Sequence, residues 1–181
     1  LMAIGGCIRR WLRPARTDSR DIEGDIMTLE IAERPTHALL EAARSQAAAA
    51  GLPYAGGVSP QDAWALVQAG DAVLVDVRSA EERKFVGLVP DSVHVAWATG
   101  TSLTRNPRFV RELEAKTGKE AVVLLLCRSG NRSALAAEAA AKAGFTQVFN
   151  VLEGFEGELD GAQRRGASNG WRFHGLPWIQ D

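Results

Sequence analysis

The chain has 181 residues, of which 46% are hydrophobic and 24% charged, a composition typical of a globular protein with one well-filled core. Its formal net charge of -1 gives no reason to expect nucleic acid or an anionic membrane as partner, so any recognition of anions must be local. Two cysteines, Cys7 and Cys127, cannot form a disulfide framework, and neither has a second cysteine or a histidine at a zinc spacing. We therefore expect no metal site and a reducing, cytoplasmic location.

The N-terminal region differs from the rest of the chain. Residues 9–20 carry five arginines against a single acidic residue, Asp18. The chain begins with leucine, whereas Met27 opens a more ordinary stretch. We expect residues 1–35 to form a flexible tail, and part of residues 1–26 to be foreign to the natural protein.

A helix is predicted next, because residues 36–50 are rich in strong helix formers with apolar side chains at helical spacing. Gly51 and Pro53 stop it, so we assign residues 36–53 to this helix and expect it to lie outside the main domain. Residues 54–57 read as a linker.

Short apolar runs alternate with helical patterns over residues 54–160, which we assign to one domain. Ser59 and Pro60 predict a helix start, with the serine as N-cap and the proline in the first turn. Helices are predicted at residues 59–68, 107–116 and 133–143, and strands at residues 72–77, 93–95, 121–126 and 147–152. This alternation predicts the α/β class, with a parallel sheet covered on both sides.

The last residues, 161–181, contain Trp171 and Trp178 but no periodicity. We expect an irregular arm that packs its aromatic side chains on the surface of the domain. His94 alternates with two valines and is expected to be packed rather than catalytic, and His174 has no partner visible in the sequence.

Cys127 follows the strongest predicted strand, and a polar loop separates it from an alanine-rich helix: Arg128, Ser129, Gly130, Asn131, Arg132 and Ser133. Ligands of open α/β sheets bind at the carboxyl ends of the strands. Loop N–H groups, the next helix's dipole and nearby guanidinium groups favour an anion and lower the pKa of a cysteine there. We predict a nucleophilic Cys127 in an anion-binding loop, with Gly130 at positive φ and oxyanion contacts from Arg128 and Arg132. The alternative of a merely buried cysteine does not explain this polar loop.

The segment from Cys127 to Ser133 resembles the active-site loop of the rhodanese-like sulfurtransferases. Further similarity to the family lies at residues 75–78, 87–92 and 144–155, so that the resemblance covers roughly residues 58–157. The sequence departs from the family pattern at Leu88, Asp91, Ser92 and Glu153, and it has one extra residue between Glu82 and Gly87.

The resemblance implies a mostly parallel five-stranded sheet flanked by helices on both faces. It implies that Cys127 takes the outer sulfur of thiosulfate or a similar anion, holds it as a persulfide and passes it to a thiol or cyanide, with a thioredoxin-like protein among the acceptors. No cofactor is implied beyond this covalent intermediate. The loop N–H groups and Arg132 would stabilise the persulfide and the departing sulfite.

Three residues are assigned supporting roles. Asp76 and Arg78 would fix the loop and pair with Glu81 or Glu82, or else form only a partly exposed ion pair. Trp97 would line the site, or else belong to the core.

Two alternatives remain at the level of sequence. Cysteine phosphatases and arsenate reductases of the same fold have five residues between cysteine and arginine, whereas only four separate Cys127 from Arg132, and this shorter loop favours a single sulfur atom over a phosphate. The second alternative is a non-catalytic binding or regulatory module that uses the N-terminal helix and the C-terminal arm as interaction surfaces. The retained cysteine argues against it.

Overall fold

The computed structural model describes residues 35–180, so the expectations for residues 1–34, and for Cys7, lie outside the described residues. The elements in chain order are α2 (Pro35–Ala50), β1 (Gly56–Val58), α3 (Pro60–Gln68), β2 (Val73–Asp76), α4 (Ala80–Val86), β3 (Val93–His94), β4 (Ala98–Thr99), β5 (Thr104–Arg105), α5 (Phe109–Thr117), β6 (Val123–Leu126), α6 (Asn131–Lys142) and β7 (Val148–Val151). None of the helices in this part of the chain has the length and hydropathy needed to cross a membrane.

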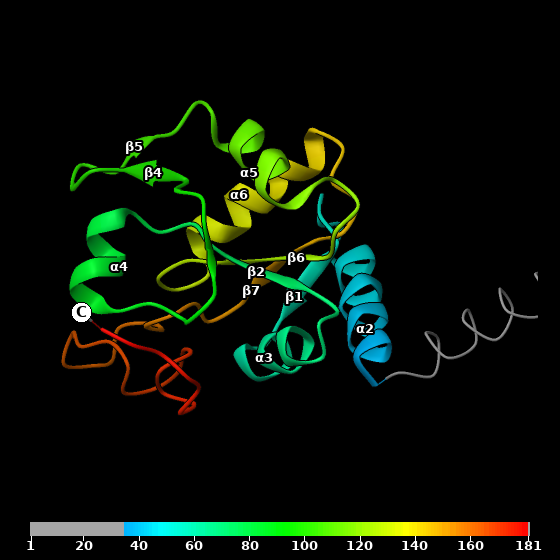
Figure 1. Cartoon of the computed structure of the whole chain (residues 1–181). Helices are drawn as coiled ribbons and strands as arrows, with labels where there is room; N and C mark the ends of the chain where they lie inside the picture. The colour runs from blue at the N-terminus through cyan, green and yellow to red at the C-terminus, as the bar shows by residue number, and fades with distance from the viewer. Residues whose placement is uncertain (1–34, 181) are drawn as a thin grey trace, which may run out of the picture. The chain divides into compact units, whose positions relative to one another are not determined.

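Five strands form one parallel sheet in the order β1-β7-β6-β2-β3, and β4 and β5 form a separate antiparallel pair (Figure 1). This order places β6, the strand that leads into Cys127, in the centre of the sheet. The α/β class and the five-stranded parallel sheet are therefore confirmed.

Successive residues of β6 face opposite sides of the sheet, as the pleat of a strand requires. Leu124 and Leu126 pack in a core cluster with residues of α2 and α3, whereas Val123, Leu125 and Cys127 pack with residues of α5 and α6. Figure 1 shows these helix pairs on the two faces. Because both faces are covered, every residue of β6 is apolar and buried.

The structure corrects two predictions: that the helix at residues 36–53 lies outside the domain, and that residues 54–57 are a linker. Gly56 and Gly57, predicted as linker, form β1 and pair with Phe149 and Asn150. The backbone of β1 passes close to α2, since a Cβ on Gly56 would lie 2.4 Å from the carbonyl oxygen of Ala43. Glycine is needed there, and α2 is part of the same core rather than a separate helix.

Two short elements have no counterpart among the predicted ones. The helix α4 follows β2, and the β4–β5 hairpin follows β3. Both are too short for their periodicity to stand out in a sequence. The helix α6 begins at Asn131, two residues before the predicted start, because Gly130 adopts the left-handed conformation and serves as N-cap.

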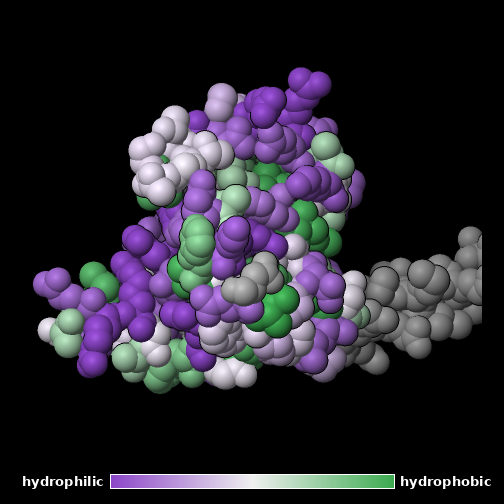
Figure 2. Space-filling view, turned by 60° about the vertical axis from the view of Figure 1, so that its left-hand side comes forward, coloured by the Kyte–Doolittle hydropathy of each residue, from purple (hydrophilic) through white to green (hydrophobic). Residues whose placement is uncertain are grey.

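The C-terminal segment is irregular, as predicted, but it does not merely cover the surface. Trp171 is fully buried in the core cluster beneath β6 and β7, and its indole N–H donates to the carbonyl oxygen of Pro177 at 2.9 Å. Ile179 pairs antiparallel with Leu88 through two backbone hydrogen bonds. Ile179 and Trp178 remain partly exposed, and Figure 2 shows hydrophobic side chains in patches between hydrophilic ones on one face of the molecule.

His174 has partners that the sequence did not indicate. Its Nε2 lies 2.6 Å from Oε2 of Glu153, and its Nδ1 lies 2.8 Å from the amide nitrogen of Gln61. The same carboxylate oxygen accepts the backbone N–H of Gly170 at 2.8 Å. The histidine therefore fastens the C-terminal segment to the turn that follows β7.

Candidate functional site

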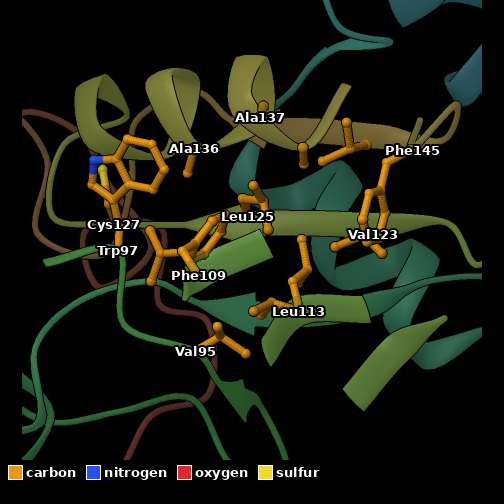
Figure 3. Packing of buried hydrophobic residues seen from close by; sticks show 14 of the residues in the cluster. Val95, Trp97, Phe109, Leu113, Val123, Leu125, Cys127, Ala136, Ala137 and Phe145 are labelled. Carbon is orange, nitrogen blue, oxygen red and sulfur yellow. The ribbon is translucent and has the colours of Figure 1, made fainter. Parts of the chain in front are cut away.

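Cys127 is the first residue after β6, at the carboxyl edge of the sheet, and only 1% of its surface is exposed. Its side chain lies on the face covered by α5 and α6, in the same cluster as Trp97. Figure 3 shows the cysteine sulfur beside the Trp97 indole. Among the described residues it is a free thiol.

Two donors converge on the sulfur of Cys127. The backbone N–H of Gly130 donates to Sγ at 3.1 Å, and Oγ of Ser133 lies 3.1 Å from Sγ as well. The hydroxyl of Ser133 also lies 3.1 Å from the carbonyl oxygen of Gly130, so its single proton is shared between two acceptors. Both donors therefore point at the sulfur atom that was predicted to be the nucleophile.

The loop around Cys127 is hydrogen-bonded to the turn that follows β7. The carbonyl of Cys127 accepts the N–H of Phe155 at 2.7 Å, and that of Arg128 accepts the N–H of Glu156 at 2.9 Å. Gly154, with φ of 66°, touches the loop so closely that a Cβ would lie 2.5 Å from the nitrogen of Ser129. The backbone of the Cys127 loop therefore packs directly against the backbone of the turn that follows β7.

Gly130 has to be glycine for two reasons. Its φ is 91°, and a Cβ would lie 1.8 Å from the carbonyl oxygen of Leu152. The N–H that donates to Sγ belongs to this residue. Replacing it would strain the backbone and push the loop away from its support.

We expect Gly130→Ala to lower the free energy of unfolding by about 2–5 kcal/mol, the combined effect of left-handed strain and overpacking. Gly144→Ala is the matched control, because Gly144 also has a positive φ, 97°, but nothing within 4 Å of an added Cβ. It should lose only about 1–2 kcal/mol. Urea unfolding of both variants measures the difference, and equal losses would show that the contact with Leu152 is unimportant.

Arg132 lies in the first turn of α6 and pairs with Glu82 of α4. Its two terminal nitrogens meet the two carboxylate oxygens at 2.8 and 2.5 Å, a bidentate arrangement. Oε2 of Glu82 also accepts the backbone N–H of Ser79 at 3.0 Å, while the Ser79 hydroxyl accepts the N–H of Glu82, which completes a capping box at the start of α4. Arg132 thus joins α6 to α4, and Glu82 is engaged with it rather than with Arg78 as predicted.

The ion pair changes the pKa of both of its members, Glu82 and Arg132. Burial would raise the pKa of Glu82, but hydrogen bonds from Arg132 and Ser79 and the charges of Arg132 and Arg78 outweigh burial and lower the pKa below its ordinary value of 4.5. The hydrogen bonds to Glu82 raise the pKa of Arg132. Both groups are therefore charged at neutral pH.

A carboxyl group with a lowered folded-state pKa stabilises the fold above its ordinary pKa, and this stabilisation is lost as the pH falls through the folded-state value. Glu82→Gln removes that contribution. We expect the variant to be less stable than the wild type at about pH 7, and the difference to be smaller at about pH 3, because the stabilisation by Glu82 is lost as the pH falls through its lowered pKa. Urea unfolding at the two pH values tests this, and a difference that stays constant would contradict the assignment.

Asp76 and Arg78 form a fully buried ion pair at the end of β2. Arg78 donates through its backbone N–H, Nε and Nη2 to Asp76, with the closest contact at 2.7 Å, and Nη2 also donates to the carbonyl of Gly87. Neither side chain is exposed, so the alternative of a partly exposed pair is excluded. The guanidinium also lies 4.0 Å from the centroid of the Phe155 ring, behind the Cys127 loop.

Asp76 additionally pairs with Arg83 of α4 at 3.0 Å. The carbonyl of Arg78 lies 2.8 Å from Nε2 of His94, which is half-buried and packed as expected. These contacts tie the ends of β2 and β3 to α4. The pair is in contact with α4 and with Phe155 of the turn next to the loop, and its supporting role toward the loop stays a prediction.

The remaining predicted residues are placed as follows. Arg128 and Asn131 are exposed, and Ser129 is half-buried between them. Trp97 is a core residue, 6% exposed, whose ring meets Phe109 edge to face at 5.0 Å. It also lies beside Cys127 (Figure 3); its place in the core is thus confirmed, and its lining of the site stays a prediction. In residues 35–180, no three His, Cys, Asp or Glu side chains gather closely enough to hold a metal ion.

Sequence reasoning missed the contribution of Glu82 to the loop and the backing of the loop by residues 154–156. The capping-box spacing of Ser79 and Glu82 was a signal for the start of α4, although not for the pairing with Arg132. The sequence gives no such signal for residues 154–156, because they contact the Cys127 loop through backbone atoms.

Comparison with known proteins agrees with this fold. The family described as Rhodanese-like domain matches residues 59–158, so the chain belongs to the rhodanese-like domain family. The crystal structure of Rv0390 from M. tuberculosis is similar with 47% sequence identity and a TM-score of 0.64, and the match covers 71% of this chain and 99% of that one.

Two curated relatives extend the comparison. The Rickettsia prowazekii protein called "Uncharacterized protein RP600" is 33% identical over 116 residues, which are 62% of this chain and 87% of that protein. Thiosulfate sulfurtransferase GlpE of Coxiella burnetii is 30% identical over 99 residues, 55% of this chain and 82% of that protein.

Proposed function

We propose that the protein is a sulfurtransferase that carries a sulfane sulfur on Cys127. The observation that supports this best is the pair of donors, Gly130 N–H and the Ser133 hydroxyl, aimed at a cysteine sulfur at the carboxyl edge of the sheet. The similarity to thiosulfate sulfurtransferase GlpE lends distant support.

In the first half-reaction, the Cys127 thiolate attacks the outer sulfur of thiosulfate or a similar donor. A sulfur–sulfur bond to Cys127 forms as the donor's own sulfur–sulfur bond breaks, and the electron pair of the broken bond leaves with sulfite. In the second half-reaction, a thiolate or cyanide attacks the outer sulfur of the persulfide and releases the Cys127 thiolate. The two steps balance without any external oxidant or reductant.

The loop supplies electrostatic stabilisation to both steps. The N–H of Gly130 and the hydroxyl of Ser133 are fixed before the reaction, so they can stabilise anionic sulfur without reorganising. Arg128 is exposed at the rim and is available to attract the anionic donor. Arg132 contributes chiefly by holding the first turn of α6 against α4, because its charge is already paired with Glu82.

The competing activity is hydrolysis of a phosphate ester by the same cysteine. Four residues separate Cys127 from Arg132, and the arginine is engaged with Glu82 rather than free to hold an oxyanion. Both features favour transfer of a single sulfur atom. Turnover of thiosulfate with cyanide and of an aryl phosphate, measured side by side on the full chain, should give thiocyanate and little or no phosphate. Phosphate release alone would overturn the proposal.

A further inference from the structure

A second concave site lies between the end of β3, the β4–β5 hairpin and the start of α5. Its volume is about 550 Å³, a size that suits a small organic molecule. The lining includes His94, Arg105, Arg108, Glu112 and Lys116, and it includes neither Cys127 nor any residue from 128 to 133. The site is therefore distinct from the cysteine loop.

Within residues 35–180, one carboxylate lines the pocket, that of Glu112, and it already has partners. Glu112 accepts from the amide nitrogen of Asn106 at 3.1 Å through one oxygen, and lies 3.3 Å from Nε of Arg108 through the other. The negative charge of Glu112 is thus balanced by Arg108.

Two cations of the pocket lack such a partner. Lys116 donates to the backbone carbonyl of His94 at 2.6 Å, and within residues 35–180 it meets no carboxylate. The guanidinium of Arg105 lies 3.6 Å from the centroid of the Trp97 ring, and in the same part of the chain it makes no hydrogen bond or ion pair. Stacking on tryptophan holds this guanidinium in place while its N–H edge stays available. The pocket is therefore prepared for an anion.

The start of the helix α5 forms part of the lining. Pro107 and Arg108 line the pocket just before α5 begins, and Oδ1 of Asn106 accepts the backbone N–H of Arg108 at 3.0 Å. Glu112 lies in the first turn of α5 and partly offsets the positive end of the helix dipole, so the preference for an anion rests on Arg105 and Lys116. The apolar parts of Val95, Ala96 and Pro107 complete the lining and suit a carbon skeleton.

We propose that this pocket binds a small organic carboxylate, with Arg105 as the bidentate partner and Lys116 as the second cation. The Arg105 guanidinium stacks on Trp97, and Trp97 packs in the same cluster as Cys127 (Figure 3), so a ligand bound to Arg105 would lie near this cluster without occupying the cysteine loop. The site is independent of sulfur transfer.

Calorimetric titration of the full chain at constant ionic strength tests the proposal, with citrate as the probe and inorganic phosphate as the comparison anion. We expect citrate to bind with one molecule per chain and more tightly than phosphate. Arg105→Gln and Lys116→Gln should each weaken citrate binding about tenfold or more, the usual effect of losing a hydrogen bond to a charged group. Arg111→Gln is the matched control, since Arg111 is exposed on the same helix, does not line the pocket and carries the same charge.

Three results would overturn the proposal: no citrate binding, phosphate binding as tightly as citrate, or an equal loss of affinity in Arg111→Gln. Citrate binding that persists in Cys127→Ser supports a separate site, and its disappearance there would assign the anion to the cysteine loop instead. Because Arg105 and Lys116 are both exposed, their variants are expected to fold, which unfolding in urea confirms.

Discussion

Cys127→Ser is expected to lose sulfur transfer from thiosulfate to cyanide by at least about 10³-fold, because the attacking group itself is removed. A serine hydroxyl is not ionised at neutral pH and forms no persulfide. The measurement is the rate of thiocyanate formation at saturating donor and acceptor. The hydroxyl fits the same buried position and accepts the same bonds from Gly130 and Ser133, so the variant should remain folded.

Cys7→Ser provides the control, because it removes the other thiol of the chain. It should leave the rate unchanged. A Cys127→Ser variant that keeps its activity, or a Cys7→Ser variant that loses it, would contradict the assignment of the nucleophile.

Asp76→Ala is expected to have the largest effect on stability. It leaves Arg78 buried with its charge uncompensated and removes the partner of Arg83 as well. Breaking a buried ion pair in this way destabilises proteins by about 3–5 kcal/mol. Urea unfolding measures the change in the free energy of unfolding.

Two comparisons sharpen this prediction. Glu138→Ala removes a partner of Lys142 in a surface pair at 2.6 Å, and should cost no more than about 0.5 kcal/mol. The double variant Asp76→Ala with Arg78→Met should recover part of the loss, since it removes the buried charge itself. If Asp76→Ala alone proves as stable as Glu138→Ala, the buried pair does not stabilise the fold.

The core of the fold was predictable because its signals are local. The apolar run ending at Leu126 is short, as is typical of a strand buried on both faces, and Cys127 follows it directly. Ser59 and Pro60 marked the start of α3 through their own backbone preferences, and the Ser59 side chain accepts the N–H of Asp62. The position of the cysteine at the sheet edge followed from these elements alone.

What sequence reasoning missed depends on contacts between distant segments. Arg132 and Glu82 are 50 residues apart, and nothing local distinguishes this pairing from one between Glu82 and Arg78. The strand β1 contains two glycines, which are unfavourable in strands, and it exists because it pairs with β7. Trp171 lies in an irregular segment, and its burial depends on a core that other elements build.

The two sites of the molecule are joined by Trp97, whose ring contacts Arg105 and lies in the cluster of Cys127. A carboxylate bound to the available N–H edge of Arg105 would leave this stacking in place. Whatever the effect on turnover, binding and sulfur transfer are measured separately, so either proposal can fail while the other stands.

The central claim is that Cys127 carries the transferred sulfur. Mass spectrometry of the intact chain after treatment with thiosulfate tests it directly. The wild-type chain should gain the mass of one sulfur atom and lose it again on addition of cyanide, while Cys127→Ser should gain nothing. A wild-type chain that gains no sulfur, or a Cys127→Ser chain that gains one, would contradict the account.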